Sequence, residues 1–115
     1  MRIDPKGAEA SRLRQRKFQL LRTLKIPPEA LPGSLALTYR RCGKPTCRCV
    51  QGEGHPSWSL TFMVGGEKRV EYIPTEWVEE VCRRVELGRQ AKEGLAEILA
   101  ANAQLLALER RQRRR

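Results

Sequence analysis

The sequence lacks the side chains that build a large hydrophobic core. Six of its 115 residues are aromatic, and no apolar run approaches the roughly 18 residues that a transmembrane helix needs. The N-terminal stretch also lacks the apolar core of a signal peptide, so we expect a cytoplasmic protein with no membrane partner. A core this thin often depends on a metal ion or a partner chain for its stability.

Catalytic motifs are missing as well. The chain has no glycine-rich nucleotide loop, no paired catalytic carboxylates in a suitable setting and no serine–histidine–acid constellation. A cysteine nucleophile with His55 as its base is conceivable, but nothing in the sequence orients this histidine, and three cysteines crowd the same loop. The sequence therefore favours a protein that is not an enzyme.

Acidic residues are outnumbered by basic ones, 13 against 23, which gives a net charge of +10. The excess lies at both ends and around the cysteines: residues 1–25 carry +6, residues 26–50 carry +3 and residues 101–115 carry +4. A strongly basic chain indicates an acidic partner. We interpret this distribution as favouring nucleic acid, without distinguishing DNA from RNA.

Hydropathy patterns predict an α+β fold with three segments. Residues 1–30 contain a basic helix from Ala8 to about Lys25, which the prolines at 27 and 28 end. Residues 31–75 alternate as strands at 34–41, 57–64 and 69–73, and the glycines at 65 and 66 predict a hairpin, so we expect a three-stranded antiparallel meander. Residues 76–115 form a long helix and an arginine-rich tail.

Three features of the C-terminal helix lead to specific expectations. Gly88 and Gly94 each weaken a helix by about 1 kcal/mol relative to alanine, and a break or kink between them is one interpretation. Thr75 is expected to cap the start of the helix. Cys82 falls near Val78 and Val85, so we expect it to be buried as a small apolar residue.

A cluster of soft ligands joins the first two strands. Cys42, Cys47, Cys49 and His55 lie within fourteen residues, in a loop rich in glycine and proline. Three cysteines and one histidine are among the common ligand sets of structural zinc, and nearby cations favour the thiolate form that binds metal. We therefore predict one structural zinc ion. The alternatives are a loop of reduced cysteines without metal, and Cys82 in place of His55 as the fourth ligand.

The segment from Leu31 to Val81 resembles an uncharacterised family of small bacterial and archaeal proteins. The pattern runs from a proline-glycine-serine start through YRxCGKxxCxC and a GxxH element to a hairpin and YIP. The matching residues are Pro32 to Ser34, Tyr39, Arg40, Cys42 to Lys44, Cys47, Cys49, Gly52, His55 and Tyr72 to Pro74. The chain departs from the pattern where Pro56 directly follows His55. Some family members are associated with transposase-like proteins, so the resemblance implies a nucleic-acid context.

The candidate nucleic-acid contacts are basic side chains near the cysteine loop and on the N-terminal helix. Such contacts to phosphates give sequence-tolerant, salt-dependent binding. The alternative is a solvated helix face and a charge that serves only solubility. The candidates are Arg40, Arg41, Lys44, Arg48, Arg12, Arg14, Arg16 and Lys17, with Arg110 to Arg115 as a basic tail.

The C-terminal helix also has an apolar stripe for partner recognition. Leu95, Leu99 and Leu106 recur at coiled-coil spacing with one polar residue, Asn102, among them. This pattern predicts a homodimer through these four residues and supports a second function hypothesis, a protein–protein assembly module. The alternative is that the helix folds back on the first helix of its own chain, with Asn102 at the edge of the contact.

Overall fold

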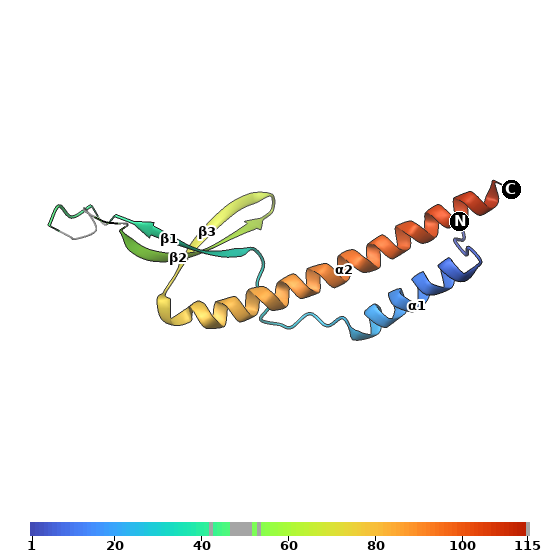
Figure 1. The fold of residues 1–115 in the computed structure, drawn as a ribbon, viewed down its shortest axis with the longest axis horizontal. Helices are drawn as coiled ribbons and strands as arrows, with labels where there is room; N and C mark the ends of the chain where they lie inside the picture. Colours follow the sequence, from blue (N-terminus) through green and yellow to red (C-terminus); the bar gives the residue numbers. More distant parts are fainter. Residues whose placement is uncertain (42, 47–51, 53, 115) are drawn as a thin grey trace. The chain divides into compact units, whose positions relative to one another are not determined.

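A computed structural model describes residues 1–41, 43–46, 52 and 54–114 of the chain. It contains helix α1 (Ala8–Thr23), strands β1 (Ser34–Arg40), β2 (His55–Val64) and β3 (Glu67–Ile73), a short 3-10 turn at Thr75–Trp77, and helix α2 (Val78–Arg113) (Figure 1). The three strands form one antiparallel sheet in the order β1-β2-β3. The predicted α+β fold is therefore confirmed. No helix of the described residues is long and apolar enough to cross a membrane.

The chain divides into two compact units, which we name by their content. The helical unit comprises residues 1–26 and 90–115, and the sheet unit comprises residues 27–89. The three segments expected from the sequence are thus grouped into two units, and α2 contributes residues to both. This grouping matters for function because the two units carry very different charge.

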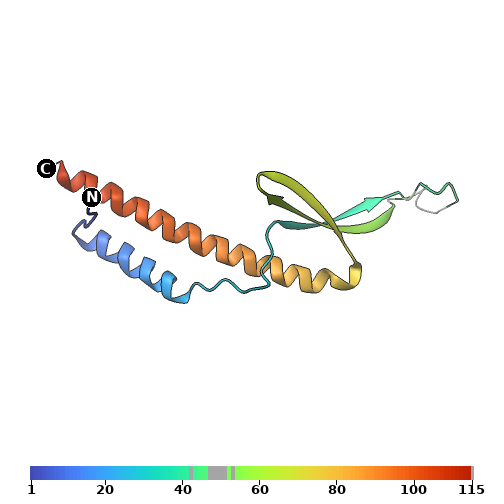
Figure 2. The ribbon, with the colours of Figure 1, turned by 180° about the vertical axis from the view of Figure 1, so that it is seen from behind.

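The helical unit is an antiparallel pair of helices. In Figures 1 and 2, α1 lies alongside the C-terminal part of α2, and both chain ends lie at the same end of the pair. Its core is small and consists of Ala10 with Leu105 and Leu108, with Leu13 packed against it. The backbone amide of Lys6 donates to the side-chain carbonyl of Gln112 at 2.8 Å, which fixes the N-terminal segment to the end of α2.

The sheet unit has two faces that differ in chemistry. Residues paired across neighbouring antiparallel strands share a face, so the register assigns every strand position. We name one side the apolar face; it holds Leu35, Leu37, Tyr39, Pro56, Trp58, Leu60, Phe62, Val64, Glu67, Arg69, Glu71 and Ile73. We name the other side the hydroxyl face; it holds Ser34, Ala36, Thr38, Arg40, His55, Ser57, Ser59, Thr61, Met63, Lys68, Val70 and Tyr72.

The apolar face is only partly covered. Leu60 is its one buried side chain, at 5 % exposure, and Trp77 beside it is 58 % exposed. A hollow of about 500 Å³ lies between the sheet and the start of α2, lined among others by Phe62, Trp77 and Val81. The sheet unit therefore has a shallow core, as the scarcity of aromatic residues predicts.

Several ion pairs form along the first turns of α2. Arg83 and Arg84 both bond to the Glu80 carboxylate, at 2.6 and 2.9 Å. These hydrogen bonds, that from Arg83 first, lower the pKa of Glu80 to about 2. Arg83 also lies 3.6 Å from Glu29, which links the helix to the loop before β1.

Three expectations about the long helix are corrected by the structure. Gly88 and Gly94 do not interrupt α2, which runs unbroken from Val78 to Arg113. Thr75 provides no side-chain cap, because the chain enters the helix through a 3-10 turn preceded by Pro74. Cys82 is exposed rather than buried. It lies about 100° around the helix from Val81, at the edge of the side that carries the partly buried valines, and there it remains open to solvent.

Candidate nucleic-acid interface

The net charge is concentrated in the helical unit. This unit carries 14 Lys and Arg residues against 5 Asp and Glu, a net charge of +9, whereas the sheet unit carries 9 against 8, a net charge of +1. The basic residues around the cysteine loop are therefore balanced within their own unit. The folded chain presents its strongest positive field on the helical unit, where it would attract a polyanion.

Three of the four basic residues predicted on α1 already have intramolecular partners. Arg14 lies 3.0 Å from Asp4 and also donates to the carbonyl of Pro5, and Arg16 lies 2.8 Å from Glu97. Lys17 donates to Asn102 at 3.1 Å. A phosphate would have to replace these contacts. Within the described part of the chain, Arg12 alone of the four has no such partner.

These contacts lower the pKa values of the acidic partners. A hydrogen bond from Lys6, together with its charge, lowers the pKa of Asp4, and Arg14 adds to the effect. A hydrogen bond from Arg16 lowers the pKa of Glu97 and correspondingly raises that of Arg16. The pairs are about half exposed, so solvent screens them and each contributes little to stability.

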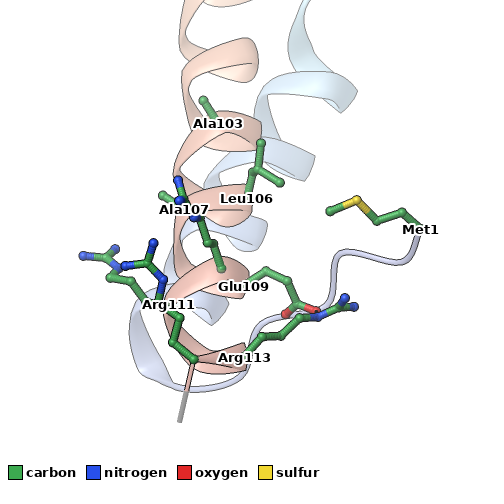
Figure 3. A pocket seen from close by; sticks show the side chains of 9 residues that line it. Met1, Ala103, Leu106, Ala107, Glu109, Arg111 and Arg113 are labelled. Carbon is green, nitrogen blue, oxygen red and sulfur yellow. The ribbon is translucent and has the colours of Figure 1, made fainter.

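The C-terminal end of α2 carries a cluster of four described arginines. A hollow of about 790 Å³ lies there, with Met1, Ala103, Leu106 and Ala107 as its apolar part and Arg110, Arg111, Arg113 and Arg114 among its lining. Figure 3 shows Met1 and Leu106 pointing toward each other, with Glu109 beside Arg113. Glu109 is 8 % exposed and bonds to Arg113 at 3.0 Å. The other three arginines form no ion pair with the residues that the structure describes.

The cations predicted beside the cysteine loop are described in part. Arg40 ends β1, and Arg41 and Lys44 follow it as exposed residues. Arg48 lies outside the described residues. One contact was not predicted from the sequence: the Arg40 guanidinium lies 4.8 Å from the ring centroid of Tyr72 on β3. Only the register of three strands places these two residues on the same face.

Of the four predicted zinc ligands, only His55 lies among the described residues. Cys42, Cys47 and Cys49 lie outside the described residues, and His55 is the exposed first residue of β2, opposite Arg40. Gly54 precedes it with φ of +96°, and a β-carbon there would lie 2.8 Å from the Arg40 carbonyl. Glycine is therefore required where the chain returns from the loop to the sheet.

A family model for a domain of unknown function, DUF6788, matches residues 8–83, well over half of the chain. The chain belongs to the DUF6788 family. The match spans α1, the sheet and the first turns of α2, and includes the motif from Pro32 to Pro74. Membership in a family of unknown function agrees with the resemblance to an uncharacterised family. Searches of the curated proteins and of the solved structures found no match.

Proposed function

We propose that this protein is a nucleic-acid-binding module. One observation carries the proposal: nine of the ten net positive charges belong to the helical unit, where several arginines have no carboxylate partner among the described residues. Phosphates are the abundant polyanion that such an array suits, through contacts that position the ligand without reading its sequence. The association of family relatives with transposase-like proteins, implied by the resemblance, favours an accessory role in DNA processing.

Charge-neutral variants test this proposal. Changing Arg110, Arg111 and Arg114 to glutamine removes three unpaired cations from the helical unit. Each lost phosphate contact should reduce the slope of log affinity against log salt by about 1, so the triple variant should lose about 3. Fluorescence anisotropy with a labelled duplex and a labelled single strand, at several salt concentrations, measures this slope.

The sheet unit offers a matched control with the same change in net charge. Arg83, Arg84 and Arg89 are also three arginines on α2, but the first two bond to Glu80 and the third to Glu86. Their change to glutamine should leave most of the salt slope intact. Micromolar wild-type protein that binds neither nucleic acid at low salt would refute the function. Equal losses in both triple variants would refute the assignment to the helical unit.

We propose in addition that the cysteine loop holds a structural zinc ion. The ligands are Cys42, Cys47, Cys49 and His55, whose thiolate and imidazole groups suit a closed tetrahedral site. Zinc would fasten the two strands that the loop joins, and this supports a sheet unit whose core is shallow. Three thiolates and one Zn²⁺ together carry a charge of −1, so the surrounding cations also neutralise the site.

A second candidate function, assembly, is favoured by one specific observation. The helical unit has an apolar stripe that its own two helices leave open: Phe18, Leu21, Leu95, Leu99 and Leu106 are each 44–59 % exposed. The hydrogen bond from Lys17 to Asn102 brings the two helices' contributions together. The Lys17 ammonium lies 4.8 Å from the centroid of the Phe18 ring, and Leu21 lies one turn from Lys17. The three leucines of α2 lie one or two turns from Asn102.

We propose that a second copy of the chain covers this stripe. Residues 98–108 contain no charged side chain in a chain that is 31 % charged, so two copies can approach there without bringing cations together. Two helical pairs joined in this way form a four-helix bundle. Burying the exposed halves of ten apolar side chains contributes about 10 kcal/mol, which is comparable to the cost of association. We therefore expect a weak dimer.

Sedimentation equilibrium tests the dimer and separates it from nucleic-acid binding. Leu99→Glu should abolish self-association, whereas Leu37→Glu, at an exposed leucine of the sheet unit, should not. Added salt should strengthen the dimer, because it screens repulsion between two +10 chains, while it weakens binding to a polyanion. A monomer at high micromolar concentration and high salt would contradict the assembly proposal.

A further inference from the structure

The hydroxyl face of the sheet has the chemistry of an open binding surface. Its central strand presents Ser57, Ser59 and Thr61, which are small and able to donate or accept hydrogen bonds. Arg40 lies on one outer strand and Lys68 on the other. None of the described positions on this face is acidic, because the two glutamates of β3 lie on the apolar face. The face is therefore positive and polar although the sheet unit as a whole is nearly neutral.

An arginine–tyrosine pair lies across this surface. Arg40 on β1 reaches over β2 to the ring of Tyr72 on β3, at 4.8 Å from its centroid. It can do so because the residues between them on β2, Ser57 and Ser59, have short side chains. The guanidinium covers part of one ring face, yet Tyr72 remains 58 % exposed. A second planar group can therefore stack on the pair.

We propose that the hydroxyl face binds a short segment of single-stranded nucleic acid, with one base stacked on the Arg40–Tyr72 pair. This inference rests on the proposed nucleic-acid function and names its ligand class. The adjoining phosphates lie against Arg40 and Lys68, and the serine hydroxyls bond to base edges. Aromatic rings on an open sheet bind unpaired bases in this way, whereas the base faces of a duplex are already stacked.

The alternative occupant is another protein, for which Met63 and Val70 would be the anchors, at 60 % and 44 % exposure. Two features favour the nucleic acid. The cation–π pair is a planar surface that matches a base, and the face has cations without carboxylates. A protein partner would leave the cations of this face without a defined role.

The chain provides a matched pair of tyrosines for the test. Tyr72 lies on the hydroxyl face, and Tyr39 lies on the apolar face with a similar exposure of 51 %. We would titrate wild type, Tyr72→Ala, Tyr72→Phe and Tyr39→Ala with a labelled oligothymidylate and with a labelled duplex of equal length. Tyr72→Ala should weaken single-strand binding about 5- to 150-fold, the effect of losing one stacked base.

The other samples should respond differently. Tyr72→Phe keeps the ring and should keep single-strand affinity, and Tyr39→Ala should match wild type. Duplex binding and the salt slope should be the same for all four proteins, because no phosphate contact is removed. The fluorescence of Trp58 and Trp77, both in the sheet unit, checks that each variant is folded.

A second measurement needs no variant. Adding the oligothymidylate to the wild-type protein should shift the NMR amide signals of Ser57, Ser59 and Tyr72, and leave those of the apolar face unchanged. If wild type binds nucleic acid but Tyr72→Ala binds the single strand equally well, or if the shifts map elsewhere, the inference is overturned and the nucleic-acid function stands. If wild type binds neither nucleic acid, the function itself fails.

Discussion

Replacing Gly88 by alanine is predicted to destabilise the sheet unit, although alanine is the better helix former. The position lies inside α2, where the loop before β1 makes a close approach. The amide of Leu31 donates to the Arg84 carbonyl at 3.0 Å, and a β-carbon on Gly88 would lie 2.1 Å from the Leu31 carbonyl oxygen. Ordinary contact begins near 3.4 Å, so the loop must move by more than an ångström.

The change in the free energy of unfolding is the sum of two destabilising contributions and one stabilising contribution. Overpacking costs about 1–3 kcal/mol. Loss of the hydrogen bond between Leu31 and Arg84 costs about 1 kcal/mol. The higher helix propensity of alanine restores about 1 kcal/mol. We expect a net loss of about 1–3 kcal/mol in the free energy of unfolding, and each kcal/mol lowers the melting temperature of a domain this size by roughly 4–8 °C.

The assay is thermal unfolding followed by tryptophan fluorescence, because Trp58 and Trp77 both belong to the sheet unit. Gly94→Ala in the helical unit is the matched control. There, the added β-carbon would meet only the tip of the Leu24 side chain, at 2.8 Å, which can rotate away. This variant should leave the fluorescence midpoint unchanged and stabilise the helical signal in circular dichroism. A raised midpoint for Gly88→Ala, as helix propensity alone predicts, would refute the reasoning.

Three further predictions concern the metal, the acid stability and the helical stripe. Freshly purified, reduced protein should contain one zinc per chain by atomic absorption; Cys47→Ser should release it, and Cys82→Ser, at the exposed cysteine of α2, should not. A reading near zero for wild type would contradict this. The folded-state pKa of Glu80, lowered to about 2 from 4.5, lies below its unfolded value, so its stabilisation is present above pH 4.5 and is lost as the pH falls toward 2. Glu80→Gln should therefore lower the urea midpoint above pH 4.5 but not near pH 2; equal effects at both would be inconsistent with the ion pairs. Asn102→Leu should preserve self-association but broaden its stoichiometry in sedimentation equilibrium. Loss of association in that variant would show that Asn102 is needed for association itself and not only for the alignment of the two helices.

Local patterns in the sequence predicted most of the secondary structure. The prolines after Lys25, the alternation in the strands and the glycine pair at 65 and 66 act over a few residues, so they can be recognised without the fold. The structure places the turn between β2 and β3 at this glycine pair, as predicted. Strands β2 and β3 each begin two residues earlier than the alternation indicated, at His55 and Glu67, because pairing with a neighbouring strand extends the ladder beyond the apolar positions.

Helical periodicity was less decisive for α2. It identified the apolar stripe of Leu95, Leu99 and Leu106, and the alternatives of folding back and self-association both remained open. The structure buries the neighbouring residues Ile98 and Leu105 and leaves Leu95 and Leu99 exposed. Asn102 lies at the edge of the contact, bonded to Lys17. Periodicity defines which residues share a side of a helix, but it does not specify which neighbour covers that side.

By itself, then, the sequence determined the class of fold, the order of its elements, the excess of positive charge and the cluster of cysteines. Four contacts were decided by the tertiary structure alone. The Leu31 carbonyl packs against Gly88, and Arg14 and Arg16 form ion pairs with carboxylates. Arg40 on β1 contacts the ring of Tyr72 on β3, across β2. The reason is sequence separation. These contacts join residues far apart in the chain, and their geometry depends on strand register and helix packing, which no short pattern of residues encodes.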